Sequence, residues 1–252
     1  MSNLTESNQI STWRFELKYR ISILDYYKMR IALRPYMDKD FYTNIASSNG
    51  YLIRSLYYDT YDYRAYNEKM AGDHERIKFR LRTYSTDIEE NPSIRVEMKV
   101  RKGNAMEKHV VHVSIDDYNC FVRRKHWPEN DNPVLQEFER YMHLWNLKPQ
   151  VLIQYYREGY QDREKDGIRI TFDQNVCAAH SIDLFPTGPV FFRSFQQNAV
   201  ILEIKCKNKH PIWLRDFVRN YGLRWVANSK FTQAIQSARN DLYHPDGVVI
   251  IR

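Results

Sequence analysis

Basic residues spaced two apart are the most distinctive chemical feature of this 252-residue chain. Basic and other polar residues alternate with apolar residues in five segments, which are 13–20, 76–82, 94–101, 168–173 and 202–207. A period of two is typical of a β-strand with one buried face. The polar faces favour binding of a phosphate chain, because a guanidinium group holds two phosphate oxygens at once and a lysine adds a point charge.

Four carboxylates are interleaved with these cations, namely Glu16, Glu97, Asp173 and Glu203. On their own they would repel phosphate. As ligands of a hard divalent cation that bridges phosphate oxygens, they are compatible with it. The pattern therefore favours a metal–triphosphate site over a plain nucleic-acid groove.

Alternating charges also occur on strands whose outer face simply lies in water, and this is the common interpretation of any single strand. The charges here are mainly Arg and Lys and recur on most of the strands. Such stacks would repel one another across a flat open sheet. We therefore expect the strands to curl into a barrel that encloses a polyanion, with the apolar faces pointing outward under a cover of helices.

Weaker strand patterns at 51–58, 108–113 and 151–157 bring the expected number of strands to about eight, enough to close a barrel. Capping residues and helix breakers predict helices at 22–34, 62–70, 114–125, 133–145, 211–222 and 229–242. The expected fold class is therefore α+β: a closed antiparallel β-barrel tunnel with a polar cationic lumen and helices packed outside.

Composition sets the broad class of the protein. The 38 Lys and Arg residues against 31 Asp and Glu give a formal net charge of +7, and 43% of residues are hydrophobic. This apolar content excludes a disordered chain, and no apolar run approaches the ~20 residues of a membrane span. Three cysteines without a CxxC pair argue against a disulfide framework or a structural zinc site, so a cytoplasmic location is expected. We expect one domain at 13–242, between tails at 1–12 and 243–252.

Eight short segments occur in an order that resembles a known family. They are 14–19, 55–60, 78–84, 97–99, 155–157, 169–173, 202–205 and 229–231. Together they resemble the catalytic domain of the vacuolar transporter chaperone (VTC) polyphosphate polymerases, which belong to the CYTH-like triphosphate tunnel metalloenzymes. The resemblance covers residues 14–238.

This resemblance implies a tunnel that binds a nucleoside triphosphate together with Mn²⁺ or Mg²⁺. The implied activity is transfer of the γ-phosphate of ATP onto a growing inorganic polyphosphate chain, with release of ADP. The implied catalytic residues are Lys18, Arg80, Arg82, Lys99, Arg157, Arg169 and Glu203, of which Glu203 is the main metal ligand. Further substrate-binding residues are expected to be Arg14, Lys78, Lys108, Tyr155, Lys205, Ser229 and Lys230, and further metal ligands Glu16, Glu97 and Asp173.

The sequence departs from the wider superfamily at its first strand. That superfamily begins with two alternating glutamates before a lysine, whereas Arg14 holds the first of those places here and only Glu16 remains before Lys18. Exchange of a metal ligand for a cation matches the polymerase branch better than the hydrolase or cyclase branches. The segment 225–228 lacks a lysine that relatives often carry, so the family's pattern of basic residues is incomplete.

Other functions remain open on the sequence alone. Water that reached the γ-phosphate would turn the same site into an inorganic or nucleoside triphosphatase, and a site without turnover would be a polyphosphate- or nucleotide-binding module. The expected partners are ATP and inorganic polyphosphate, with no nucleic acid. No transmembrane segment is expected, which leaves room for association with a separate membrane protein.

Overall fold

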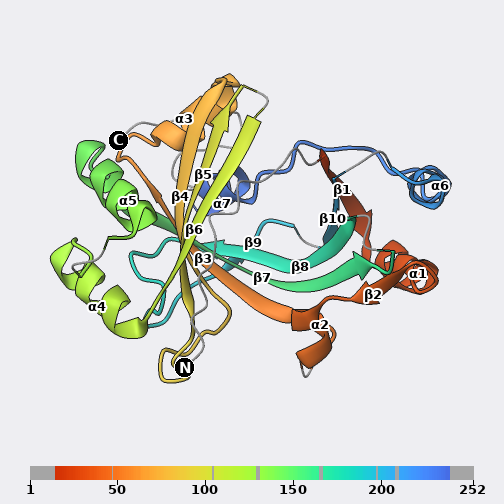
Figure 1. Cartoon of the computed structure of the whole chain (residues 1–252), viewed down its shortest axis with the longest axis horizontal. Coiled ribbons are helices and arrows are strands. Elements are labelled where there is room, and N and C mark those ends of the chain that lie inside the picture. The colour runs from red at the N-terminus through yellow and green to blue at the C-terminus, as the bar shows by residue number, and fades with distance from the viewer. Residues whose placement is uncertain are drawn as a thin grey trace. The chain divides into compact units, whose positions relative to one another are not determined.

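The computed structural model describes residues 15–238 apart from 47, 104, 129–130, 165–166, 197 and 208–209 (Figure 1). Its strands are β1 (Phe15–Ser22), β2 (Met37–Lys39), β3 (Tyr51–Asp59), β4 (Glu75–Thr83), β5 (Ile94–Lys102), β6 (Ala105–Val113), β7 (Lys148–Asp162), β8 (Arg169–Ala179), β9 (Arg193–Ser194) and β10 (Ala199–Cys206). Its helices are α1 (Ile23–Leu33), α2 (Phe41–Ile45), α3 (Arg64–Ala71), α4 (Ile115–Arg124), α5 (Pro133–Leu144), α6 (Ile212–Asn220) and α7 (Lys230–Ala238). Arg14 and the two expected tails lie outside the described residues.

The strands form one sheet in the order β1-β10-β8-β7-β3-β4-β5-β6, with β2 added beside β7 and β9 beside β8. Its pairs β1–β10, β10–β8, β4–β5 and β5–β6 are antiparallel. The expected α+β class and the main path of eight strands agree with this order.

The expected closed barrel is wrong. Within the part of the chain that the structure describes, β1 and β6 end the path and do not pair with each other, so no closed wall surrounds a cationic lumen. Alternation in a sequence predicts which side chains share a face, but closure also depends on strand tilt and stagger. The repulsion between cations that favoured closure is instead reduced by buried carboxylates on the same faces.

The chain separates into two compact units. Among the described residues, unit 1 comprises 55–152 and 181–188, and unit 2 comprises 15–54, 153–180 and 189–238. Strands β3 and β7 contribute residues to both. The single domain expected at 13–242 stays a prediction.

Unit 1 is organised around the antiparallel strands β4, β5 and β6, with α4 and α5 beside them (Figure 1). Both helices begin where the sequence predicts: Ser114 and Asp117 form a capping box for α4, and the side chain of Asn132 accepts from Val134 N at the start of α5. The apolar face of β4 packs on α5 through Phe79 and Phe138, whose ring centroids lie 5.6 Å apart. Burial of a side chain of this size contributes about 1.5–3 kcal/mol.

Unit 2 places α1 against β1 and β10. The Ser22 side chain accepts from Asp25 N and starts the helix as expected, and α1 buries Met29 and Leu33 in a core shared with Phe172 of β8. The helix expected at 211–222 is present as α6, and that expected at 229–242 is present as α7, up to the last described residue. The short elements β2, α2 and β9 were not predicted, because two to five residues are too few to show a periodicity.

No helix in the described ranges has the length and apolar character needed to cross a membrane.

Candidate functional site

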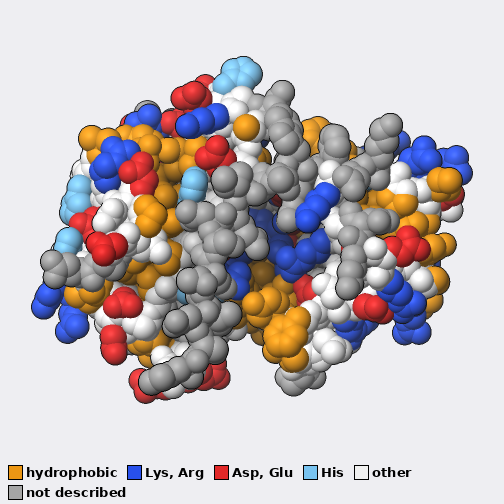
Figure 2. Space-filling model, viewed as in Figure 1, with side chains coloured by type: hydrophobic (Ala, Val, Ile, Leu, Met, Phe, Trp, Pro, Cys, Tyr) orange, Lys and Arg blue, Asp and Glu red, His pale blue; other side chains and the backbone are white. Residues whose placement is uncertain are grey.

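The register of unit 2 gathers charged side chains on one face of β1, β10 and β8. Lys18 lies opposite Glu203 across β1 and β10, and Glu16 lies opposite Lys205. Residues two apart on a strand point to the same side, so all four side chains share one face. Glu16 contacts Lys18 at 2.9 Å, and Glu203 contacts Lys205 at 3.1 Å. Lys and Arg side chains gather over β8 and β10 in the space-filling view (Figure 2).

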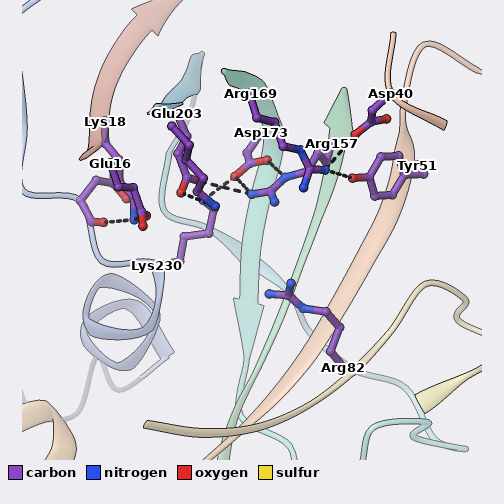
Figure 3. Close-up of polar contacts among 12 residues, drawn as sticks. Glu16, Lys18, Asp40, Tyr51, Arg82, Arg157, Arg169, Asp173, Glu203 and Lys230 are labelled. Carbon is purple, nitrogen blue, oxygen red and sulfur yellow. Dashed lines mark hydrogen bonds and ion pairs between the residues drawn. The ribbon is translucent and has the colours of Figure 1, made fainter. Parts of the chain in front are cut away.

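A buried ion-pair network joins this face to β7. Arg157 donates from Nε to Asp173 Oδ1 at 2.6 Å and from Nη2 to Asp173 Oδ2 at 2.8 Å, and its Nη2 lies 3.4 Å from Glu203 (Figure 3). Lys230 approaches the same Asp173 carboxylate at 2.5 Å. The structure therefore brings together the expected residues Arg157, Asp173, Glu203 and Lys230.

The charges of this network stabilise one another. Burial opposes the ionised form of Asp173, but Arg157 and Lys230 outweigh it and lower the pKa of Asp173. Burial likewise disfavours the charge on Glu203, yet Lys205 and Lys18 hold its pKa well below the ordinary value. Burial would lower the pKa of Lys18, but Glu203 and then Glu16 raise it. These groups are therefore ionised at neutral pH.

Helix α7 delivers Lys230 to the network at its first turn. The Ser229 hydroxyl accepts from Thr232 N at 3.3 Å, so Ser229 caps this helix as expected. The Lys230 ammonium lies 4.9 Å from the ring centroid of Tyr155, and the Arg157 guanidinium lies 5.4 Å from it. Tyr155 thus supports two cations with its ring face, and a hydroxyl contact to phosphate stays a prediction.

Arg169 is held by residues that the sequence did not single out. Its Nη2 lies 2.8 Å from Asp40 Oδ2 and 3.3 Å from the Tyr51 hydroxyl (Figure 3). Asp40 is itself fixed, because its other oxygen accepts from Thr43 N at the start of α2. These contacts orient a guanidinium whose side chain is 42% exposed. Asp40 belongs to no alternating segment, so only its capping position could have drawn attention to it.

Unit 1 carries a second basic face, which we call the β4–β5–β6 basic face. On it, Lys78 lies opposite Lys99, Lys99 lies opposite Lys108, and Arg80 lies opposite Glu97. The remaining cations of this face are Arg76, Arg82, Arg95 and Arg101. The expected residues Lys78, Arg80, Arg82, Lys99, Lys108 and Glu97 therefore share one face. Arg76, Arg95 and Arg101 belong to the same alternation but were not selected from the sequence.

Glu97 is the centre of this second face. It accepts from Arg80 Nε at 2.7 Å and from Arg80 Nη2, and Lys108 Nζ lies 3.3 Å from it. Arg80 also donates to the Tyr57 hydroxyl at 2.8 Å, and Arg82 donates to the Ser55 hydroxyl at 3.1 Å.

Burial disfavours the charge on Glu97, but Arg80, Arg82 and Lys108 together hold the pKa of Glu97 far below its ordinary value. At Lys108 the effect of burial is not outweighed. Burial lowers the pKa of Lys108 to about 7, because the attraction of Glu97 is offset by repulsion from Arg80 and Arg82. The Lys108 side chain is 39% exposed, so solvent moderates this effect. Its charge therefore changes near neutral pH.

The carboxylates differ in how well they suit a divalent cation. Among the described residues, no group of three or more His, Cys, Asp or Glu side chains is placed to hold a metal ion. Asp173, Glu97 and Glu203 each contact cations of their own unit. Glu203 differs in having a second carboxylate, Glu16, diagonally across the β1–β10 pair on the same face. Two carboxylates combined with phosphate oxygens are a usual ligand set for Mg²⁺, so Glu203 with Glu16 fits the expected ion best.

Comparison with known protein families places the chain in one of them. The family whose model matches is the VTC domain, over residues 13–239. The chain belongs to the VTC domain family, which confirms the family that the sequence resembles. No curated protein matches it in sequence.

One solved structure shares the fold at low sequence identity, and others resemble the chain less well. A candidate adenylate cyclase from Bacillus halodurans is 11% identical with a TM-score of 0.54, over 86% of this chain and 94% of that one. A candidate adenylate cyclase from Vibrio parahaemolyticus is 12% identical with a TM-score of 0.47, over 88% and 97%. The Mimivirus capping enzyme triphosphatase is 14% identical with a TM-score of 0.32, over 85% and 89%. The first of these likenesses shows a common fold and no more.

Proposed function

We propose that this protein is a polyphosphate polymerase, which transfers the γ-phosphate of ATP onto a growing inorganic polyphosphate chain and releases ADP. Family membership supports this proposal. The observation that carries it is the state of the carboxylates: Asp173, Glu203 and Glu97 are all buried among cations, with pKa values below their ordinary range.

Such carboxylates are weak bases, because a base with a low pKa has little tendency to take a proton near pH 7. Activation of water by one of them would therefore be inefficient. The terminal phosphate of a polymer needs no such help, since it is already ionised. This contrast favours phosphate over water as the acceptor.

The cations of unit 2 would bind and orient the phosphates. The guanidinium of Arg157 is pre-oriented by Asp173, and Lys18, Lys205 and Lys230 stand beside it as point charges. Phosphoryl transfer depends mainly on in-line positioning and charge neutralisation, which such fixed cations supply. A divalent cation held by Glu203 and Glu16 would neutralise further charge on the phosphate oxygens.

The proposal also includes the roles of the named residues, the use of ATP, Mn²⁺ as the metal, action in the cytoplasm and association with a separate membrane protein. It further includes a single domain at 13–242.

The test is incubation of the purified chain with ATP and Mn²⁺, followed by sizing of the product on a gel. Long polyphosphate is the expected result. Orthophosphate alone would support a triphosphatase, and tight binding of tripolyphosphate without turnover would support a binding module. Either result would overturn the proposed polymerase.

A further inference from the structure

The β4–β5–β6 basic face has an end where cations face cations. Arg76 lies directly opposite Arg101, and the neighbouring pair on the same face is Lys78 opposite Lys99. Like charges at directly opposite positions of an antiparallel pair destabilise a sheet. The Arg76–Arg101 pair is therefore a structural cost.

Carboxylates do not offset this charge as they do further along the strands. Among the described residues of β4, β5 and β6, Glu97 is the sole carboxylate on this face, and it is engaged with Arg80 and Lys108. Arg101 donates from Nε to the carbonyl oxygen of Gly103 at 2.8 Å, and no ion pair within the described residues involves Arg76 or Arg101.

Arg76 is also buried, with 8% of its surface exposed. Burial first and the neighbouring Arg101 second lower the pKa of Arg76, and the attraction of Asp73 and Glu68 does not restore it. The guanidinium is thus held close to a like charge with little compensation. A bound anion would add the negative charge that the described residues of β4, β5 and β6 do not place at this end of the face.

We infer that Arg76 and Arg101 form a subsite for a linear polyphosphate chain longer than a triphosphate. This inference rests on the proposed function, and it names where the polymer lies on unit 1. Arg76 is four residues from Arg80 on one strand, which is about 13 Å. A triphosphate held at Arg80 does not reach that far, whereas a longer chain of phosphates does.

The test compares two ligands and two variants. The charge-removing double variant is Arg76→Gln with Arg101→Gln. The matched control is Arg123→Gln with Arg124→Gln, which removes the same charge from exposed positions at the end of α4. Affinities for tripolyphosphate and for a longer polyphosphate of defined length are measured by titration calorimetry.

The Arg76/Arg101 variant should bind the longer polyphosphate about tenfold more weakly, because charge-assisted hydrogen bonds are lost. Its affinity for tripolyphosphate should stay within about twofold of wild type, and the control should change neither. Equal losses for both ligands, or no loss for either, would overturn the subsite. A wild-type chain that binds the longer polymer no better than tripolyphosphate would also overturn it.

A second measurement separates a ligand subsite from a structural role. Removal of a repulsive pair should leave the melting temperature without ligand unchanged or raised, while the rise caused by long polyphosphate should shrink. A lowered melting temperature with an unchanged polyphosphate effect would identify the pair as structural. The two affinities and the rise in melting temperature caused by polyphosphate measure binding and not catalysis. Failure of polymerase activity would therefore refute the proposed function without deciding the subsite. If the Arg76/Arg101 variant lost affinity for RNA but not for polyphosphate, the pair would be assigned to nucleic acid and the inference would be overturned.

Discussion

Arg157 on β7 and Asp173 on β8 form a bidentate ion pair, with N–O distances of 2.6 and 2.8 Å. Asp173 has no exposed surface, and it also contacts Lys230 at 2.5 Å. One carboxylate therefore fixes two cations of unit 2, Arg157 and Lys230. This relationship explains how a buried guanidinium can be held ready for an anion.

Asp173→Asn should be strongly destabilising. The substitution leaves Arg157 buried without its carboxylate, so the free energy of unfolding should fall by about 3–5 kcal/mol at pH 7, measured by urea denaturation. Asp216→Asn, which removes the partner of Arg219 on the surface of α6, should cost less than about 1 kcal/mol. Equal losses for the two variants would contradict the buried pair.

The effect of Asp173→Asn should depend on pH in one direction. The pKa of Asp173 is lowered from 3.8, so its ionisation stabilises the folded state above that value. This stabilisation is lost as pH falls through the lower pKa of the folded state. The difference between wild type and variant should be constant at neutral pH and shrink in acid below about pH 4. A difference that grows in acid would contradict the assignment.

Arg80→Ala should remove most of the polymerase activity. Arg80 donates to Glu97 and to the Tyr57 hydroxyl, which aims its guanidinium along the β4–β5–β6 basic face. Loss of two charge-assisted contacts to phosphate corresponds to about 100-fold in rate. Arg140→Ala removes an arginine paired with Glu137 on the surface of α5, and it should leave the rate unchanged. Unchanged activity in the Arg80 variant, with the fold intact, would exclude a role in binding phosphate.

Tripolyphosphate binding should weaken as Lys108 loses its proton. The pKa of Lys108 is lowered to about 7, so the ammonium is present below pH 7 and lost above it. Bound phosphate raises that pKa, and the loss of affinity should therefore begin near pH 7 and extend upward. The measurement is calorimetry between about pH 6 and 9 for wild type and Lys108→Arg, which stays charged throughout.

The ratio of the two dissociation constants corrects for the ionisation of the phosphate itself. It should be flat below pH 7 and should increasingly favour the arginine variant above it. A ratio that does not change with pH would show that Lys108 is not the titrating group.

Glu203→Gln should change the response to metal. With Glu16, this carboxylate has the best arrangement for a divalent cation, so the Mn²⁺ concentration for half-maximal activity should rise about 10-fold or more. Glu137→Gln, an exposed change on α5, serves as the control. An identical Mn²⁺ response in wild type and the Glu203 variant would remove Glu203 as a ligand.

The sequence predicted which side chains share a strand face better than it predicted whether the sheet closes into a barrel. Lys78, Arg80 and Glu97 were expected on one polar face from a period of two, and the cross-strand register places them there. Whether the first and last strands meet depends on sheet curvature, which this period does not encode. The closed barrel was inferred from repulsion between cations, from the number of strands and from the family resemblance. Buried carboxylates reduce that repulsion without closure of the sheet.

Partners of the cations were harder to predict than the cations themselves. Asp40 orients Arg169 across 129 positions of sequence, from the start of a five-residue helix without periodicity. Asp173 and Glu97 were expected as metal ligands, a role that stays a prediction, and the structure pairs Asp173 with Arg157 and Glu97 with Arg80. Such pairing depends on the register between strands, which turns and core packing decide together.

The central claim is tested most directly by following each phosphate of ATP. The purified chain is incubated with Mn²⁺ and ATP labelled either at the γ- or at the α-phosphate, and the products are separated by size. We predict that the γ-label alone enters long polyphosphate while ADP accumulates in equal amount to the phosphate transferred. Recovery of the γ-label only as orthophosphate, or its retention in ATP, would contradict the account.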